Sequence, residues 1–293
     1  MRVLILGAGG MLGHKVWQIF RDRFDCRAAV HTRLPMVMFD DERVIDGVDA
    51  SDFGVVKDLI EKTRPAVVVN CIGVVKQLAA AHDPITSITL NSLFPHIVSR
   101  VCGEAGARMI HISTDCVFAG TRGDYNESDV PDAADLYGRS KLLGEVVTAE
   151  RGGPPLTIRT SIVGRELRTS NGVVEWFLAN RGGSVRGFTR AMFSGVTTTE
   201  LARTLASLVE QHRDLEGLYH VAGAAISKYD LLVMLSEALG AEVVIAPDDS
   251  VVIDRTLDAT RFRSATGIAP LSWPEMIAGL AAESPQYERW RTE

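Results

Sequence analysis

The chain begins Met1-Arg2-Val3-Leu4-Ile5-Leu6-Gly7-Ala8-Gly9-Gly10-Met11-Leu12-Gly13, a short apolar run that passes directly into a glycine-rich stretch. The apolar run predicts a buried strand, and a helix is predicted behind it because apolar residues recur at helical spacing, at Leu12, Val16, Ile19 and Phe20. Glycines in such a turn let a diphosphate approach the free N–H groups that begin the helix. This position in the chain therefore predicts a dinucleotide site at Gly7, Gly10, Met11, Leu12 and Gly13, with a ligand-free tight turn as the alternative.

The first half of the chain alternates predicted strands with predicted helices. After the first strand, further strands are expected at residues 27–31, 44–48, 66–70, 109–113 and 156–163. Helices are expected from a Ser51 cap to just before Pro65, from Ile85 to Ala105 with Pro95 as a kink or break, and from Leu136 to Ala149. This alternation indicates a parallel sheet with right-handed crossovers, so residues 1–164 are expected to form a doubly wound, NAD(P)-binding Rossmann domain.

After Gly164 the pattern is less regular. Helices are expected at residues 171–179, 197–211 and 228–239, the last capped by Ser227, and a terminal helix is expected to start near Pro274. Short strands are expected at residues 218–221 and 243–245. Residues 165–293 are therefore predicted to form a smaller, discontinuous α/β substrate-binding lobe that interleaves with the sheet, with residues 196–222 returning to the first domain.

Composition and charge exclude several classes of protein. The chain has 293 residues, of which 46% are hydrophobic and 23% charged, as in ordinary soluble globular proteins. Its net charge of -6 provides no basic footprint for a general nucleic-acid binder. It shows neither a signal-peptide pattern nor an apolar stretch long enough to span a bilayer, and its four cysteines have no metal or disulfide spacing. We therefore expect a soluble, cytoplasmic protein that binds no metal, nucleic acid or membrane.

The residues after the second predicted strand bear on the choice of cofactor. An acidic residue there would hold a ribose 2′-hydroxyl, whereas an arginine accommodates a 2′-phosphate. The chain has His31-Thr32-Arg33 and no carboxylate, which favours NADPH over NADH, with Arg33 as the phosphate partner or else as a solvated loop residue. Asp49 is placed either to reach the adenine or to form an ordinary turn. His14 and Lys15, just past the glycine loop, are expected to be exposed.

Tyr137 and Lys141, four residues apart, indicate a site for proton transfer. They lie on one face of the expected helix, and an ammonium near a phenol favours the phenolate, which makes the tyrosine a better proton relay at neutral pH. In carbonyl reduction, Tyr137 would protonate the developing alkoxide while Lys141 holds the nicotinamide ribose. Thr114 follows a strand at the edge where open α/β sheets bind ligands, and its hydroxyl can hydrogen-bond the same carbonyl oxygen.

Taken in order, the motifs resemble those of the extended short-chain dehydrogenase/reductase superfamily and, within it, the dTDP-4-dehydrorhamnose reductase family. The resemblance covers most of the chain and rests on the glycine loop, Val69-Asn70-Cys71, Asn91, Ser113–Gly120, Tyr125-x-Glu127-x-Asp129, Tyr137 with Lys141, Arg159-Thr160-Ser161 and Gly217–Gly223. It implies an NADPH-dependent reductase of the 4-keto group of a nucleotide-linked deoxysugar, in polysaccharide or nucleotide-sugar biosynthesis. A nucleotide sugar is thus the expected small-molecule partner, and a homodimer is one expected assembly.

The resemblance also implies roles for single residues. Thr114, Tyr137 and Lys141 take the catalytic positions, and Asn91 orders the helix beside them. The cofactor is expected to contact the end of the fourth strand, at Asn70, Cys71, Ile72 and Gly73. Separately, substrate contacts are expected near the cleft at Lys76, Thr114, Asp115, Cys116, Arg165 and Arg190. A diphosphate favours bidentate guanidinium groups, and the alternative for the arginines is a solvated surface position. The family commonly has a tyrosine where Cys116 stands.

Three alternatives follow from the same motifs. Related 4,6-dehydratases use a Thr-Asp-Glu triplet, and the thiol of Cys116 is a poor substitute for that glutamate. A nucleotide-sugar 4-epimerase needs only the tyrosine and the lysine, but such enzymes usually carry an acidic residue after the second strand, which this chain lacks. The third alternative is a non-catalytic, NADP-binding regulatory subunit, for example of methionine adenosyltransferase, although all three catalytic positions are filled in this chain.

Overall fold

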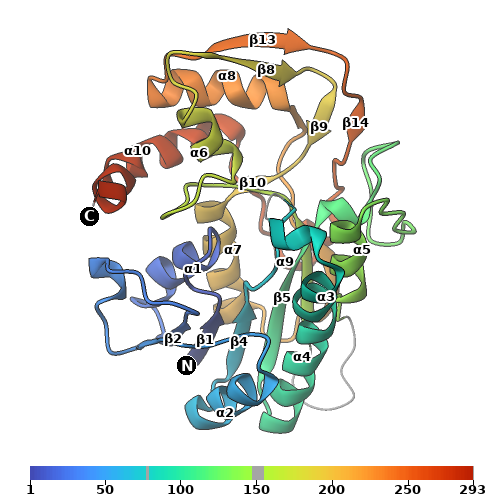
Figure 1. The fold of residues 1–293 in the computed structure, drawn as a ribbon. Helices are drawn as coiled ribbons and strands as arrows, with labels where there is room; N and C mark the ends of the chain where they lie inside the picture. Colours follow the sequence, from blue (N-terminus) through green and yellow to red (C-terminus); the bar gives the residue numbers. More distant parts are fainter. Residues whose placement is uncertain (77–78, 147–154, 293) are drawn as a thin grey trace.

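The computed structural model describes residues 1–76, 79–146 and 155–292, which form a seven-stranded parallel sheet flanked by helices (Figure 1). The strand order is β11-β6-β5-β4-β1-β2-β3, so the chain winds outward from β1 in both directions. The strands are β1 (Arg2–Leu6), β2 (Asp25–Ala29), β3 (Val44–Ile45), β4 (Val67–Asn70), β5 (Arg108–Thr114), β6 (Leu156–Thr160) and β11 (Gly217–His220). The predicted doubly wound α/β class is confirmed.

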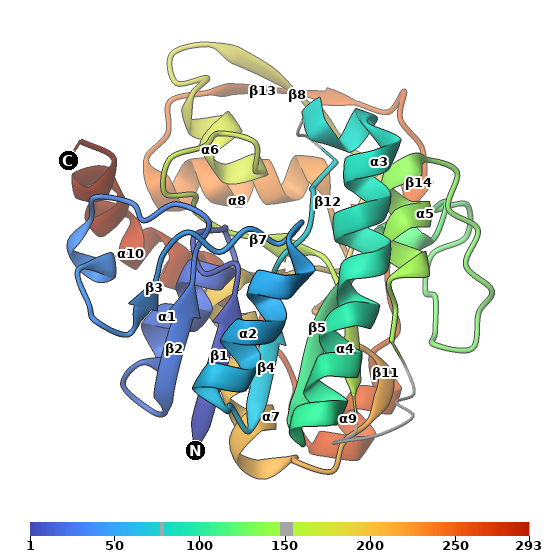
Figure 2. The same cartoon turned by 60° about the horizontal axis from the view of Figure 1, so that its bottom comes forward.

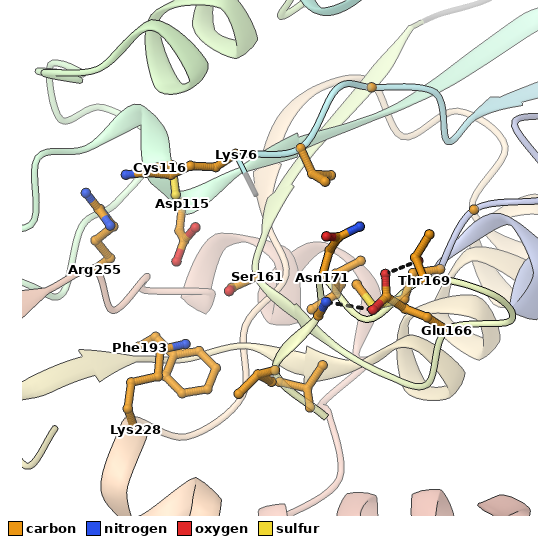
Figure 3. A pocket seen from close by; sticks show the side chains of 18 of the residues that line it. Lys76, Asp115, Cys116, Ser161, Glu166, Thr169, Asn171, Phe193, Lys228 and Arg255 are labelled. Carbon is orange, nitrogen blue, oxygen red and sulfur yellow. Dashed lines mark hydrogen bonds between the residues drawn. The ribbon is translucent and has the colours of Figure 1, made fainter. Parts of the chain in front are cut away.

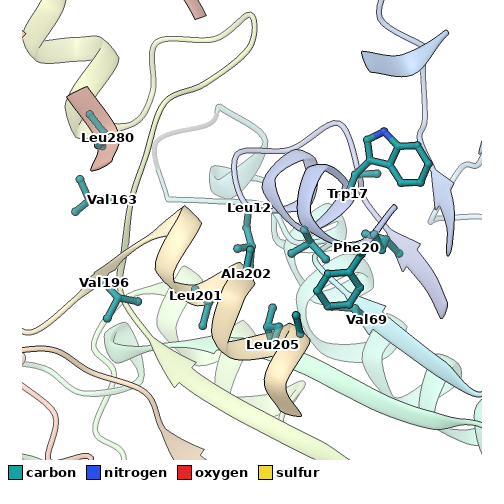
Figure 4. Close-up of a cluster of buried hydrophobic side chains, with 14 of the residues drawn as sticks. Leu12, Trp17, Phe20, Val69, Val163, Val196, Leu201, Ala202, Leu205 and Leu280 are labelled. Carbon is teal, nitrogen blue, oxygen red and sulfur yellow. The ribbon is translucent and has the colours of Figure 1, made fainter. Parts of the chain in front are cut away.

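Side chains that alternate along β1 give the sheet two packed faces. Val3 and Ile5 pack with α1 (Gly13–Phe20) and α7 (Thr198–Gln211), and Figure 4 shows Phe20 of α1 near Leu205 of α7. Leu4 and Leu6 point to the other face, which is covered by α2 (Phe53–Thr63) and α4 (Phe94–Ala105). Burial on both faces explains why the strands read as continuous apolar runs.

The long helix predicted from Ile85 to Ala105 is present in three joined segments. These are α3 (Pro84–Ser87), a π-helix (Ile88–Leu93) and α4. Pro95 lies in the first turn of α4, directly after the π-helix, so the change of helix type falls next to the residue where a kink or break was predicted. Three short 3-10 turns also occur in the described residues, at Val37–Phe39, Ala79–His82 and Asp115–Val117.

Smaller sheets lie beyond one end of the central strands, around α8 (Figures 1 and 2). Their strands are β7 (Ile162–Val163), β8 (Ser184–Phe188), β9 (Ala191–Phe193), β10 (Val196–Thr197), β12 (Ile226–Ser227), β13 (Val244–Asp248) and β14 (Ile253–Asp254). The remaining helices are α5 (Leu136–Leu143), α6 (Val173–Leu178), α8 (Lys228–Leu239), α9 (Thr260–Thr266) and α10 (Trp273–Thr292). None of the helices in the described residues combines the length and apolar character needed to cross a membrane.

Local corrections to the predicted elements have clear causes. Asp52 rather than Ser51 caps α2, because its carboxylate accepts the N–H groups of Gly54 and Val55 at 3.0 and 3.2 Å. The helix predicted to reach Ala149 ends at Leu143, and residues 147–149 lie outside the described part. The predicted exposure of His14 and Lys15 is wrong, since both are buried where α10 covers α1.

Candidate active site

The glycine loop forms a tight strand-to-helix turn. Gly7 has φ of +80°, a conformation that suits glycine, and its N–H donates to the carbonyl of Ala29 at 3.1 Å. A Cβ on Gly13 would lie 2.0 Å from the carbonyl oxygen of Gly7, so α1 can approach the loop only with glycine there. The turn therefore has the close packing that a dinucleotide-binding loop requires.

Two adjoining cavities lie between the glycine loop and the small sheets. One has a volume of about 610 Å³ and the other about 290 Å³, and both are lined by Gly10, Met11, Gly73, Asp115 and Cys116. The larger cavity extends to Phe193 of β9 and Lys228 of α8 (Figure 3). The smaller one reaches the ends of β4 and β5. Together they form one space from the dinucleotide turn to the second half of the chain.

The three predicted catalytic side chains meet at the smaller cavity. Thr114, Tyr137 and Lys141 all line it. Thr114 ends β5, where its hydroxyl accepts the N–H of Cys116 at 3.1 Å and donates to the carboxylate of Asp115 at 3.1 Å. The Lys141 ammonium donates to the carbonyl of Ile112 at 2.7 Å. The arrangement places a hydroxyl, a phenol and an ammonium around one small space.

Helix α5 is fixed against β5 by its cap and by a glycine. The carboxylate of Asp135 accepts the N–H of Gly138 at 2.8 Å and also binds the Lys76 ammonium at 2.6 Å. A Cβ on Gly138 would lie 2.2 Å from the carbonyl oxygen of Cys116, so glycine lets the helix approach the Thr114 turn closely. Lys76 lines both cavities as predicted, but its charge is already paired with Asp135.

Asn91 connects three segments beside the catalytic helix. It lies in the π-helix, and its amide oxygen accepts the N–H of Val74 at 2.8 Å. Its amide nitrogen donates to the Val74 carbonyl and to the Ser140 hydroxyl, both at 3.1 Å. These contacts place Asn91 where it orders α5 and the segment after β4, in agreement with the role that the resemblance implies.

The protonation states differ in part from those expected. Burial raises the pKa of Tyr137, and the nearby Cys116 and Asp115 act in the same direction, while a hydrogen bond with Thr114 opposes them. The expected phenolate is therefore wrong for the free protein, whose Tyr137 is a neutral phenol at neutral pH. A neutral phenol is the form that can give a proton to an alkoxide.

The charge of Lys141 predicts a pH dependence. Burial lowers its pKa to about 8, against the opposing influence of Glu145 and Cys71. Since the ammonium is the form that attracts an anionic or hydroxylic partner, we expect kcat/KM for carbonyl reduction to decline as the pH rises above about 8. The measurement is kcat/KM from pH 6 to 10, with Lys141→Arg as control. Residual activity of that variant should show no decline near pH 8, because a guanidinium stays charged there.

A buried ion pair beneath the catalytic helix was not predicted. The Glu145 carboxylate accepts two bonds from the Arg159 guanidinium, each of 2.8 Å, and one from the Ser113 hydroxyl at 2.7 Å. The two charged side chains are 6% and 3% exposed. The i,i+4 spacing of Glu145 from Lys141 is the signal in the sequence that could have placed this carboxylate near the active site.

The predicted adenosine contacts lie on the surface around β2. His31, Thr32 and Arg33 are exposed, but the Arg33 guanidinium donates to the carbonyls of Phe39 and Val44 at 3.1 and 2.5 Å. Asp49 accepts the N–H and hydroxyl of Ser51, which is the turn geometry offered as its alternative. Arg33 is thus held by its own loop in the free protein.

The predicted contacts after β4 divide into two groups. Cys71, Ile72 and Gly73 line the smaller cavity. The Asn70 side chain turns inward, where its amide nitrogen bonds His111 at 3.1 Å and its oxygen accepts the N–H of Ile72 at 3.0 Å. Asn70 therefore shapes the turn that presents the cavity wall, and it does not line the cavity itself.

Two predicted substrate contacts are not supported. Arg165 is buried and ion-paired to Glu175 at 2.5 Å and to Glu288 at 2.9 Å, so its charge is compensated within the protein. Arg190 is exposed and lines neither cavity. The spacing of the arginines after β6 does not show whether a guanidinium faces the cleft or, as for Arg165, the helices α6 and α10 of the same chain.

Among the described residues, three cations besides Lys76 line the larger cavity: the exposed Arg168, and Lys228 and Arg255, both of which sequence reasoning missed. Lys228 begins α8 with its ammonium 3.7 Å from the ring centroid of Phe193, and Arg255 donates from Nε to the carbonyl of Phe118 at 2.9 Å. Figure 3 shows Arg255 beside Asp115 and Cys116, with Lys228 next to Phe193. Burial raises the pKa of Asp115, while Lys228 and Arg255 oppose that shift. Within the described residues, no group of three or more His, Cys, Asp and Glu side chains is placed to hold a metal ion.

Comparison with known proteins adds to this geometry. The family model described as the RmlD substrate binding domain matches residues 1–277. A probable low-salt glycan biosynthesis reductase, Agl14, from Haloferax volcanii is 28% identical over 90% of this chain and 88% of its own. A dTDP-4-dehydrorhamnose reductase from Mycolicibacterium smegmatis is 28% identical over 82% of this chain and 70% of its own.

Two further matches concern a subunit and a solved structure. Methionine adenosyltransferase 2 subunit beta from Rattus norvegicus is 25% identical over 81% of this chain and 72% of its own. The crystal structure of dTDP-4-dehydrorhamnose reductase from Bacillus anthracis in complex with NADP has a TM-score of 0.81 and 21% identity, covering 96% of this chain and 99% of the other. At that identity, the structural match supports the fold.

Proposed function

This chain belongs to the family of the RmlD substrate binding domain, and on that basis we propose that it is an NADPH-dependent reductase of the 4-keto group of a nucleotide-linked deoxysugar. One observation carries the proposal. Thr114, Tyr137 and Lys141 line a single cavity that also reaches the glycine loop. The reductase names of the relatives from Haloferax volcanii and Mycolicibacterium smegmatis agree with this chemistry.

The residues around the glycine loop fit a nicotinamide dinucleotide. Gly7 and Gly13 let the loop pack closely against α1 and the segment after β4, and Gly10 and Met11, at the start of α1, line both cavities, where a diphosphate would bind. When bound, the reduced dinucleotide supplies the hydride that the carbonyl carbon accepts. We favour NADPH because the loop His31-Thr32-Arg33 has no carboxylate of its own, and NADH is the alternative to be compared in the same assay.

The protein's own groups complete the reduction. Thr114 and Tyr137 hydrogen-bond the substrate carbonyl oxygen, which becomes an alkoxide as hydride reaches the carbon. The neutral Tyr137 phenol then gives its proton to that oxygen, which yields the alcohol. Lys141, held by the carbonyl of Ile112, supplies positive charge to the cavity that Tyr137 also lines and can bind ribose hydroxyls there.

We assign recognition of the substrate's diphosphate to Lys228 and Arg255 in place of Arg165 and Arg190. Both line the larger cavity, and together they carry more charge than the neighbouring Asp115. A desolvated diphosphate needs such cations, and an arginine can bind it with two donors. The Arg255 terminal nitrogens can serve this purpose, because its hydrogen bond to the Phe118 carbonyl uses Nε.

Lys228→Met tests this assignment. Removal of one charge from a phosphate contact is expected to raise KM for the sugar nucleotide about tenfold or more, since charge-assisted hydrogen bonds contribute about 1.5–3 kcal/mol. The dissociation constant for NADPH should stay within twofold. Arg190→Met is the matched control and should leave both constants unchanged. An unchanged sugar-nucleotide KM in Lys228→Met would contradict the assignment.

The activity itself is tested by NADPH oxidation with dTDP- and UDP-linked 4-keto-6-deoxyhexoses, with NADH in parallel. Stoichiometric formation of the C4 alcohol, detected by NMR, is the expected result. Interconversion of C4 epimers with no net NADPH consumption would instead identify an epimerase. NADPH binding with no turnover on either series would overturn the reductase and favour the regulatory role suggested by the methionine adenosyltransferase subunit among its relatives.

A further inference from the structure

Helix α10 extends beyond the part of the chain that matches the family model. The match ends at residue 277, whereas α10 continues to Thr292. In Figures 1 and 2 this last part of the chain lies beside α1. Residues four apart along it, Glu283, Tyr287 and Arg291, all contact segments that line the cavities or directly adjoin them.

The first contact reaches the glycine loop through His14. The Tyr287 hydroxyl lies 2.5 Å from Nε2 of His14, and Nδ1 of His14 lies 2.8 Å from the carbonyl oxygen of Gly10. Burial lowers the pKa of His14 to about 3, so the ring is neutral. Because a carbonyl only accepts, Nδ1 carries the hydrogen and Nε2 accepts the Tyr287 hydroxyl. Tyr287 thereby holds one of the two donors to the Gly10 carbonyl, the other being the backbone N–H of His14 at 3.0 Å.

Two neighbouring charges support the same contact. The Lys15 ammonium binds the Glu283 carboxylate at 2.7 Å and lies 4.9 Å from the Tyr287 ring centroid. The Arg165 guanidinium packs against the same ring at 5.2 Å. The phenol is therefore confined between α1 and the segment that follows β7, and its hydroxyl has little freedom to move.

The second contact reaches residues 166–172, a segment of the cavity wall that lies next to Met11. The Arg291 guanidinium donates from Nη1 to the carbonyls of Glu166 and Thr169 at 2.9 and 3.0 Å, and from Nη2 to the Ser170 hydroxyl at 3.2 Å. The Glu166 carboxylate in turn accepts the Thr169 hydroxyl and the N–H of Gly172, each at 2.6 Å. Glu166, Thr169 and Gly172 all line the larger cavity.

We infer that the end of α10 positions two segments of the cavity lining, with Tyr287 acting on the glycine loop and cofactor through His14 and Arg291 acting on the substrate through residues 166–170. The two roles can be tested separately, because Tyr287 contacts α1 whereas Arg291 contacts residues 166–170. The substrate side of this inference rests on the proposed function. Both residues are positioning residues, since neither lines a cavity.

The test compares Tyr287→Phe and Arg291→Gln in the full-length chain, with Tyr229→Phe and Arg190→Gln as matched controls. NADPH dissociation constants are measured by fluorescence, and kcat and KM by NADPH oxidation. Tyr287→Phe should weaken NADPH binding about three- to tenfold, as expected for one lost hydrogen bond, with kcat within twofold. Arg291→Gln should raise KM for the sugar nucleotide by a similar factor and leave NADPH binding unchanged.

The outcomes separate this inference from the proposed function. If the unmodified protein binds NADPH but reduces no sugar nucleotide, the proposed function fails. The role of Tyr287 in NADPH binding is still tested, because the dissociation constants do not depend on turnover. If Tyr287→Phe binds NADPH as tightly as Tyr229→Phe does, the inferred role of Tyr287 in cofactor binding is wrong. If both variants weaken both ligands equally, or lower kcat alone, α10 only stabilises the fold and the inference is overturned.

Discussion

Tyr137→Phe should lower kcat for ketone reduction by about 10²- to 10⁴-fold, the usual contribution of a positioned general acid. The phenol lines the smaller cavity, and burial raises its pKa, so it carries its proton at the pH where the reduction would run. The ring remains in the variant, so the packing of α5 against the Thr114 turn should be retained. NADPH binding should therefore change by less than about threefold.

The measurement is single-turnover NADPH oxidation, which isolates the chemical step from product release. Tyr229→Phe serves as the control for a general effect of removing a phenolic hydroxyl. Retention of more than about a tenth of the activity would show that another group, or water, supplies the proton, since that loss is far below the range for a general acid. Tyr137 would then not be the proton donor of the reduction.

Glu145→Gln is expected to give the largest loss of stability, about 3–5 kcal/mol, because it leaves the buried Arg159 charge without its carboxylate. Both side chains are almost fully enclosed, at 6% and 3% exposure, so water cannot replace the lost partner. The change would be read from urea unfolding followed by circular dichroism. The same variant should shift the decline of activity with pH to lower pH, because Glu145 raises the pKa of Lys141.

A double variant tests whether the loss of stability in Glu145→Gln comes from the unpaired charge of Arg159. In Glu145→Gln/Arg159→Met no unpaired charge remains, so it should be more stable than the sum of the two single variants implies. Additive losses would mean that the two residues stabilise the protein independently. A Glu145→Gln protein with unchanged stability would show that the guanidinium finds another partner, such as His220, whose Nε2 lies 3.4 Å from Arg159.

Much of the fold was predictable because its local signals agree with its packing. The apolar runs of β1 and β4 are buried on both faces, and the glycine loop follows β1 directly, so periodicity and turn chemistry point to the same answer. Thr114, Tyr137 and Lys141 were predictable for a similar reason. Their spacing and their place at the end of a strand and on the next helix determine where they meet.

The remaining part of the site depends on contacts between distant segments. Arg165 and Lys228 are both cations in the second half of the chain, yet one faces Glu175 and Glu288 while the other lines the cavity. His14 and Lys15 were expected to be exposed, but α10, more than 260 residues later in the chain, packs over them and buries them. No local pattern encodes such an approach, so the direction of these side chains could not be predicted.

Because Ile88–Leu93 form a π-helix, the number of residues in this segment determines how the side chains around the site are oriented. A π-turn holds one residue more than an α-turn, so removal of a single residue from this segment would convert it to regular α-helix. Side chains on the two sides of the deletion would then rotate relative to each other by roughly 100°, the angle per residue in an α-helix. Asn91 could no longer face Val74 and Ser140 while α4 kept its place on the sheet. A relative that lacks one residue in this helix should therefore have a different arrangement of side chains around its active site. That holds even if it retains every catalytic residue.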